Sequence, residues 1–199
     1  MVKEAKSIAI TSHIGPDDDS ISSMLAVYWL VKNNDPKKRV KMLCKGEQTD
    51  EWGYFEGFSE IKFVDEVADH LKREDLLIVL DGSSYERFSK KPGELKKLVD
   101  KTICIDHHKN KPDEFDLLFV SANFSSTAEG VHRLLVDGDQ KITRRLAEIF
   151  LLGILGDTGN FSYIDKNTVG VLSIVEKLVK ENDIDIQELQ GKYQRFPKN

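Results

Sequence analysis

The chain has 199 residues, of which 40% are hydrophobic and 32% charged, and its formal net charge is −5. This length is enough for one domain with an ordinary buried core, and no apolar run approaches the ~18 residues that a membrane helix requires. The negative charge disfavours a surface for long duplex nucleic acid, because such surfaces rely on excess Lys and Arg to displace phosphate counterions. The composition therefore predicts a globular protein that neither spans a membrane nor binds long duplexes.

The N-terminal segment and the cysteines indicate the compartment. Residues 1–6 carry a little positive charge but lack the apolar core of a signal peptide. Cys44 and Cys104 lie in strand-like runs, where we expect reduced, buried thiols rather than a disulfide or a metal pair. We therefore expect a cytoplasmic protein, and whether it is a monomer or a homodimer stays open.

Short apolar, β-favouring runs recur along the chain, at residues 7–11, 40–44, 61–64, 76–80, 102–105 and 117–120. The run 76–80 is almost continuously apolar, which is typical of a strand buried on both faces of a parallel sheet. The pattern predicts an α/β fold with a mostly parallel sheet of about five strands, helices on both faces and a helical C-terminal part.

Helical periodicity separates these runs. The first helix is expected from about Ser20, because Ile21, Leu25 and Tyr28 fall on one face. Lysine-rich helical sequence is expected up to Lys101. After a capping box at 126–129, further helices are expected from about residue 143 to 155, from 167 to 181 and from 184 to 193.

Apolar elements of this chain end repeatedly on side chains that can bind metal. These side chains are His13, Asp17 and Asp19 after the first strand, Asp81 after another, His107 and His108 after Asp106, and Asp157 after a helix. The carboxyl ends of parallel strands form one crevice, so residues distant in sequence are expected to meet there. One acid at one strand end is more often a helix cap, but the repetition favours a shared site.

The proposed ligands are imidazole and carboxylate groups without thiolate, which suit octahedral Mn²⁺, Mg²⁺ or Co²⁺ better than a structural zinc ion. They exceed what one octahedral ion takes up, so we expect two ions that share a bridging carboxylate. Two ions about 3.5–4 Å apart activate a bridging hydroxide for in-line attack at phosphorus. The predicted reaction is hydrolysis of a phosphoester or phosphoanhydride, with the ions reversing the local field for an anionic substrate.

Four motifs occur in the order typical of one enzyme family: 13–20 (HIGPDDDS), Asp81, 106–108 (DHH) and 156–159 (GDTG). With them the chain resembles the DHH-family phosphoesterases over nearly its whole length. The resemblance implies two Mn²⁺ sites, one held by His13, Asp17 and Asp81, the other by Asp19, Asp81, His107 and Asp157, with Asp81 bridging. It further implies that His108 faces the substrate phosphate. Asp106 is expected to orient the histidines rather than to bind metal.

Two branches of the family compete. Residues 157–161 (DTGNF) resemble the nanoRNase or oligoribonuclease branch, related to RecJ-like exonucleases, which releases mononucleotides from short oligonucleotides such as linear dinucleotides or hydrolyses adenosine 3′,5′-bisphosphate. Residues 19–21 (DSI) resemble manganese-dependent inorganic pyrophosphatases and exopolyphosphatases. The first branch is favoured, because Ser20 is expected only to begin a helix. A catalytically silent nucleotide-binding module is the alternative from another class.

Members of this family usually carry a second domain with a glycine-rich substrate-binding motif, whereas this chain ends at residues 196–199. We expect residues 1–190 to form the DHH domain and residues 191–199 a tail or the start of an interdomain linker. Without that second surface, weak substrate binding and reduced turnover are expected. Lys109 and Lys111 could partly replace the second domain as phosphate contacts. The sequence is equally consistent with both being solvated loop lysines.

Overall fold

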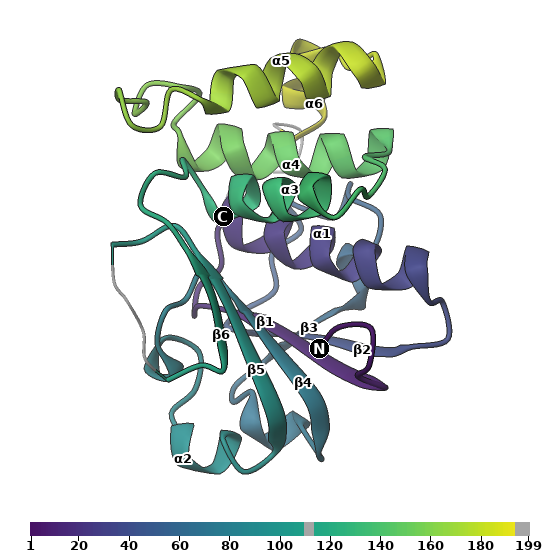
Figure 1. Cartoon of the computed structure of the whole chain (residues 1–199), viewed down its shortest axis with the longest axis vertical. Coiled ribbons are helices and arrows are strands. Elements are labelled where there is room, and N and C mark those ends of the chain that lie inside the picture. The colour runs from purple at the N-terminus through teal and green to yellow at the C-terminus, as the bar shows by residue number, and fades with distance from the viewer. Residues whose placement is uncertain (110–113, 194–199) are drawn as a thin grey trace.

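A parallel sheet forms the centre of the molecule in the computed structural model, which describes residues 1–109 and 114–193. Its strands lie in the order β3 (Ile61–Val64), β2 (Arg39–Lys45), β1 (Ser7–Ser12), β4 (Glu74–Leu80), β5 (Val99–Asp106) and β6 (Leu117–Val120). Every neighbouring pair is parallel. The α/β fold with a parallel sheet is confirmed, and the sheet has six strands where about five were predicted (Figure 1).

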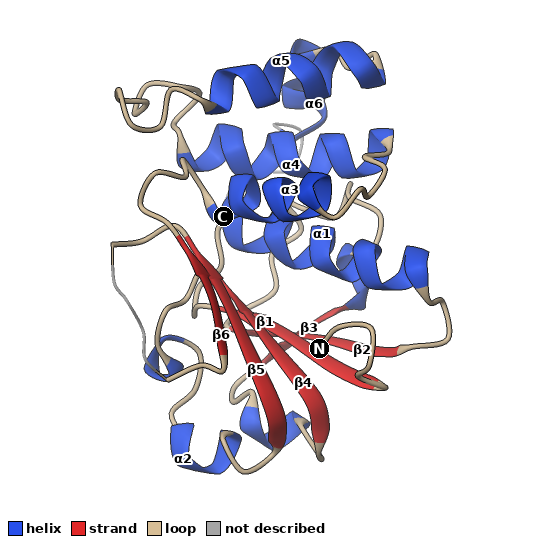
Figure 2. Cartoon of the chain, viewed as in Figure 1, coloured by secondary structure: helices blue, strands red, loops and turns tan. Residues whose placement is uncertain are grey.

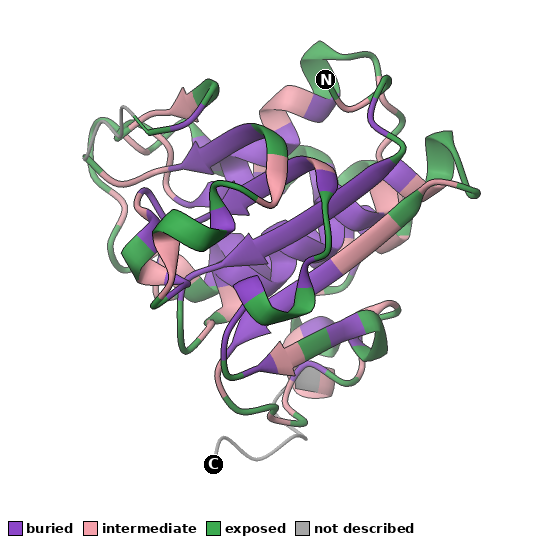
Figure 3. Cartoon of the chain, turned by 90° about the horizontal axis from the view of Figure 1, so that it is seen from below, coloured by how far each residue is buried: buried purple, intermediate pink, exposed green. Residues whose placement is uncertain are grey.

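Alternate residues of the central strands face two separate hydrophobic cores. In β1, Ile8 and Ile10 belong to the core on one side and Ala9 to the core on the other. Leu77 and Val79 of β4 face the same side as Ala9. The strands are therefore buried on both faces, as Figure 3 shows for the middle of the sheet, and their continuous apolar runs follow from this.

One face of the sheet carries the long helices (Figure 2). These are α1 (Asp18–Asn34), α3 (Thr127–Asp137), α4 (Arg144–Asp157), α5 (Val171–Asn182) and α6 (Ile186–Tyr193). α1 and α3 lie against the strands, α4 packs on both of them, and α5 packs on α4. The helical C-terminal part is thus confirmed. No helix within residues 1–109 and 114–193 is long and apolar enough to cross a membrane.

The other face has a thinner cover than predicted. Its only α-helix among the described residues is α2 (Pro92–Leu95), and 3-10 turns and loops supply the rest, including the buried rings of Tyr85 and Phe88. The prediction of helix up to Lys101 is therefore wrong. Val99 pairs with Glu74 in the parallel ladder, so the chain from Val99 onward extends β5 instead.

Side-chain caps set where the helices begin. Asp17 caps α1, since its carboxylate accepts the Ser20 N–H at 2.9 Å, and the helix begins at Asp18 rather than at about Ser20. The predicted cap of α3 is confirmed, because the Ser126 hydroxyl accepts the Glu129 N–H at 3.1 Å. α5 begins at Val171 instead of residue 167, since residues 165–168 form a turn closed by their own side chains.

The order of the strands reverses between β1 and β4. The chain leaves β1 towards β2 and β3 on one side and continues from β4 to β5 and β6 on the other. In open parallel sheets a crevice opens at the carboxyl ends of the strands at this switch point, and ligands bind there. The loops after β1 and β4 carry His13 and Asp81, so the candidate ligands gather at the switch point. The boundary at residue 190 stays a prediction, and it falls within α6.

Candidate metal centre

Asp81 lies at the middle of the site. It follows β4 directly, is only 2% exposed, and has a left-handed backbone with φ of +54°. Its N–H donates to the Ile105 carbonyl at 3.0 Å, which fixes the strand end against β5. A non-glycine residue pays a conformational penalty in this region, and such strain concentrates at functional sites.

The first group of candidate ligands lies on the Oδ2 side of Asp81. Oδ2 is 3.2 Å from His13 Nε2, and Nε2 is 3.6 Å from Asp17 Oδ2. His13 Nδ1 lies 3.0 Å from the Ile14 carbonyl oxygen, which can only accept, so Nδ1 carries a proton and Nε2 faces the carboxylates. One possible ligand atom from each of the three side chains lies within 4.8 Å of the others.

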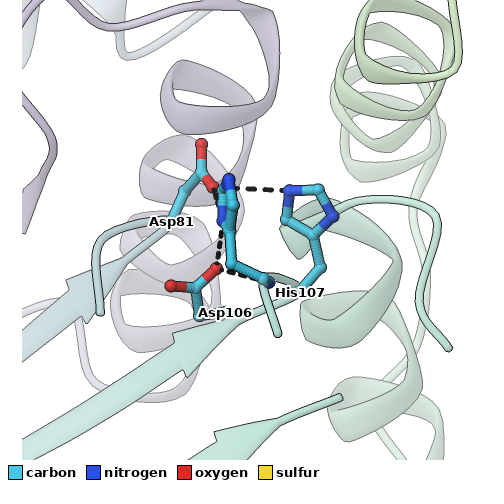
Figure 4. A group of neighbouring side chains, drawn as sticks. Asp81, Asp106 and His107 are labelled. Carbon is cyan, nitrogen blue, oxygen red and sulfur yellow. Dashed lines mark hydrogen bonds and ion pairs between the residues drawn. The ribbon is translucent and has the colours of Figure 1, made fainter. Parts of the chain in front are cut away.

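The second group lies on the Oδ1 side of Asp81. Oδ1 is 3.6 Å from His107 Nε2, which is 3.4 Å from Oδ2 of Asp157, the last residue of α4. Asp19 completes this group, with ligand atoms of Asp19, His107 and Asp157 within 4.8 Å of one another. Figure 4 shows Asp81 and Asp106 at the ends of neighbouring strands, with His107 beside them. The two oxygens of Asp81 thus face two separate groups of side chains.

Asp19 also caps the N-terminus of α3. Its two carboxylate oxygens accept the N–H groups of Thr127 and Ala128 at 2.7 and 2.8 Å, at the N-terminus of α3. Unpaired amides and the helix dipole make this end of a helix a favourable place for a carboxylate. Burial, together with the charges of Asp81 and Asp157, nevertheless raises the pKa of Asp19 well above its ordinary value.

Asp106 acts on His108. Its Oδ1 lies 2.7 Å from His108 Nδ1 and accepts the His108 backbone N–H at 3.0 Å. The expectation was that Asp106 orients both histidines, whereas the hydrogen bonds of its carboxylate found among the described residues go to His108 alone. This contact with Asp106 raises the pKa of His108. Asp106 Oδ2 is buried and has no hydrogen-bond partner in the described part of the chain.

Ser20 was missed as a site residue. Its side chain is fully buried, and its hydroxyl donates to Asp81 Oδ2 at 2.9 Å, with its oxygen 2.8 Å from His13 Nε2. Thr127 Oγ1 donates to the other oxygen of Asp81 at 3.4 Å. The expectation that Ser20 only begins a helix is therefore wrong. The helical spacing from Asp17 to Ser20 is the signal that could have placed both residues on one side of the first turn.

Of the two lysines predicted to contact phosphate, the structure describes only Lys109. Lys109 is exposed and lines a cavity together with His107 and His108. Lys111 lies outside the described residues. Arg87 ends the 3-10 turn Tyr85–Arg87 that follows Asp81, and its positive charge opposes the raised pKa of His108.

The electrostatics of the site fit bound cations. Carboxylates outnumber imidazoles, and burial and the neighbouring carboxylate of Asp81 raise the pKa of Asp157 as well as that of Asp19. Burial acts to lower the pKa of His13, but its contacts with Asp17 and Asp81 outweigh burial and raise it to about 10. Converging buried carboxylates repel one another unless positive charge lies between them. A donor set of imidazole and carboxylate suits divalent ions that prefer nitrogen and oxygen ligands.

Comparison with known proteins decides the family. A family model described as the DHH family, N-terminal domain, matches residues 7–154. The chain belongs to the DHH family. The match takes in both strand ends of the switch point and the DHH triplet at residues 106–108, and it stops just before Asp157.

Individual DHH proteins are similar to the chain as well. A probable bifunctional oligoribonuclease and PAP phosphatase NrnA from Streptococcus mutans is 28% identical over 98% of this chain and 59% of its own length. The bifunctional oligoribonuclease and PAP phosphatase NrnA from Bacillus subtilis is 28% identical over 78% of this chain and 47% of its own length. The chain thus spans about half the length of the curated relatives it matches.

A solved structure shares the fold. The exopolyphosphatase-related protein from Bacteroides fragilis superposes with a TM-score of 0.85 at 24% identity. The superposition covers 100% of this chain and 59% of that protein. At this identity the likeness establishes the arrangement of the strands and helices and leaves substrate choice to the site itself.

Proposed function

We propose that the chain is the catalytic domain of a two-metal phosphodiesterase and phosphatase, acting on short oligonucleotides, linear dinucleotides and adenosine 3′,5′-bisphosphate. One observation carries the proposal. Asp81 directs one carboxylate oxygen to the group with His13 and the other to the group with His107, as a bridging ligand would.

The donor set divides into two sites around Asp81. The residues that would hold the first ion are His13, Asp17 and Asp81, and those for the second are Asp19, Asp81, His107 and Asp157. Mn²⁺ suits this mixture best, with Mg²⁺ and Co²⁺ as alternatives. When bound, a pair of such ions lowers the pKa of water and stabilises the phosphate oxygens during in-line displacement.

The surrounding residues prepare the substrate phosphate. His108 is held by Asp106 and its pKa is raised, so its protonated form can donate a hydrogen bond to a phosphate oxygen and a proton to the leaving group. Lys109 and Arg87 add positive charge on this side of the site. Asp81, His108 and Asp106 are therefore the proposed catalytic set, with Asp106 as the positioning member.

The nature of the substrate rests partly on the relatives. The S. mutans and B. subtilis proteins are named as oligoribonucleases and PAP phosphatases, and the chain matches 59% and 47% of their lengths. Contacts with parts of the substrate remote from the reacting phosphate help to position it, so a second binding surface would strengthen substrate binding and raise turnover.

A second candidate is a manganese-dependent pyrophosphatase or exopolyphosphatase. Residues 19–21 resemble those enzymes, and this motif was discounted only because Ser20 was expected to begin a helix. The Ser20 hydroxyl instead contacts both His13 and Asp81. Because Ser20 belongs to the motif shared with the pyrophosphatases, its position in the site favours the second candidate more than the sequence alone did.

A hydrolysis assay with four substrates tests the proposal. The chain is stripped of metal by a chelator, supplied with Mn²⁺, and incubated with the dinucleotide pApA, adenosine 3′,5′-bisphosphate, pyrophosphate and polyphosphate. The proposal predicts release of mononucleotides from pApA and of phosphate from the bisphosphate, only with metal. Hydrolysis of the inorganic substrates alone would support the second candidate. Nucleotide binding without any hydrolysis would identify a catalytically silent module.

A further inference from the structure

A cavity of about 260 Å³ adjoins the metal centre on the side of His107 and His108. Its lining includes two aromatic residues, Phe124 and Tyr163. Ligand pockets for whole small molecules usually measure ~300–1,000 Å³, so this cavity has room for one nucleoside and not for an oligonucleotide. It lies next to the position where the substrate phosphate would bind.

Tyr163 is the most exposed large hydrophobic residue described, with 77% of its surface accessible. An aromatic ring left in water gives up the free energy of burial. The Tyr163 hydroxyl forms no hydrogen bond within the described part of the chain, and the ring therefore presents an unused flat surface beside the cavity.

The backbone nevertheless holds this ring in place. The ring packs over Gly159, where a Cβ atom would lie only 2.8 Å from Tyr163 Cδ2. Gly159, Asn160 and Phe161 all have left-handed backbones, with φ of +55°, +52° and +71°. The Tyr163 N–H closes the turn by donating to the Thr158 carbonyl at 3.0 Å. Two non-glycine residues in this conformation are costly, and the outcome of that strain is the placement of Tyr163 at the rim.

One buried polar group in the cavity wall lacks a hydrogen-bond partner in the described part of the chain. Ser125 Oγ is enclosed and forms no hydrogen bond among the described residues. The two threonine hydroxyls of the wall are engaged, since Thr158 donates to the Ile154 carbonyl at 2.6 Å and Thr168 donates to Asp165 at 3.1 Å. Buried polar atoms are nearly always satisfied, so Ser125 is a group that a ligand hydroxyl or a water would complete.

We propose that this cavity binds the nucleoside next to the reacting phosphate, with the base stacked on the Tyr163 ring and the sugar near Ser125. The inference rests on the proposed function and deepens it, because a stacking surface serves nucleotides and is of no use for pyrophosphate or polyphosphate. Stacking tolerates every base, since every base has a π-face. The site therefore selects nucleotides over inorganic phosphates without selecting a base sequence.

The binding of two probes that differ only in the base tests this. The Mn²⁺-loaded chain is titrated calorimetrically with AMP and with ribose 5-phosphate, and the ratio of the two dissociation constants is the selectivity for the base. Tyr163→Ala should reduce this ratio by about 5- to 150-fold, the range that loss of one stacking ring gives. Tyr163→Phe should keep the ratio. Leu172→Ala, another exposed apolar residue, serves as the control for general surface effects.

The outcomes separate this inference from the proposed function. Equal binding of the two probes by the unmodified chain, binding of neither at millimolar concentration, or an unchanged ratio in Tyr163→Ala would overturn the stacking site. A base selectivity that Tyr163→Ala removes, in a chain that hydrolyses none of the four substrates, would keep the stacking site and reject the phosphodiesterase. Circular dichroism of each variant verifies that the fold is retained.

Discussion

The Ser20 hydroxyl donates a 2.9 Å hydrogen bond to Asp81 Oδ2 in the interior of the site. This contact orients the carboxylate that is proposed to bridge the two ions. Outer contacts of this kind typically contribute 10- to 100-fold to metal affinity or activity. We therefore expect Ser20→Ala to weaken Mn²⁺ binding by about 10- to 100-fold, as measured by calorimetry.

Ser23 in the same helix is the matched control. It is equally buried, but its hydroxyl has no hydrogen-bond partner in the described part of the chain. Ser23→Ala should leave Mn²⁺ affinity unchanged. If both serine variants bind Mn²⁺ with the same affinity as the unmodified chain, Ser20 does not orient the bridging ligand.

Metal binding should depend on pH through His13. Without metal, contacts with Asp17 and Asp81 outweigh burial and raise the pKa of His13 to about 10, so His13 holds a proton near neutral pH. A cation bound to Nε2 must displace this proton, and Mn²⁺ affinity should therefore rise about tenfold per pH unit between about pH 6 and pH 8. Calorimetry in two buffers of different ionisation enthalpy would count the released proton. An affinity that stays constant over this range is incompatible with His13 as a ligand.

Gly153 lets α4 pass close to Asp19. A Cβ atom there would lie 2.7 Å from Ala128 Cβ and 3.1 Å from Asp19 Oδ1. Gly153→Ala should lower the free energy of unfolding by about 1–3 kcal/mol, because overpacking outweighs the ~1 kcal/mol gain in helix propensity. Urea unfolding measures this change. Gly191→Ala in α6 is the control, since no atom of the described residues outside its own helix turn lies within 4 Å of its added Cβ, and it should be neutral or stabilising. Equal stability of the two variants would contradict the close approach.

His132 should make the fold sensitive to acid. It is 5% exposed, and burial, aided by the charges of Arg133 and Lys177, lowers its pKa from 6.5 to about 4. Between these values the unfolded chain takes up a proton that the folded chain does not, so stability falls as the pH drops. The slope contributed is about 1.4 kcal/mol per pH unit, roughly 3 kcal/mol over the window.

The His132→Leu variant should lack this contribution to the pH dependence of the free energy of unfolding. Urea unfolding at several pH values between about pH 7 and pH 4 measures it. His70→Leu, which replaces an exposed histidine, should retain the slope of the unmodified chain. A His132→Leu variant with an unchanged slope would mean that His132 is protonated in the folded state.

The strand ends could be predicted from the sequence because the two signals that mark them, an apolar run and the acid that follows it, are adjacent in the chain. An apolar run such as 76–80 defines a buried strand, and an acid after it, here Asp81, marks the carboxyl edge where ligands gather. Asp157 was predicted instead from the break in a helical pattern, and it is the last residue of α4. The switch point then brings these residues together, as the parallel order of the strands requires.

Other features depend on contacts between distant segments. The sequence around Val99 has a helical pattern, but pairing with Glu74 across the sheet makes Val99 a strand residue. Ser20 joins the site because Asp17 takes over the cap of α1, which starts the helix early enough to direct the hydroxyl at Asp81. The cavity beside Tyr163 depends on three left-handed residues in one turn, and no composition rule predicts such a turn.

The most direct test is a titration of the metal-free chain with Mn²⁺ while pApA hydrolysis is followed, for the unmodified chain and for Asp81→Asn. Asn tolerates the left-handed backbone at this position, so the variant removes the charge with little strain. We predict that activity of the unmodified chain appears only as a second equivalent of Mn²⁺ binds, and that Asp81→Asn stays inactive at every concentration. Full activity with one equivalent or without metal, or retained hydrolysis by Asp81→Asn, would contradict a two-metal centre bridged by Asp81.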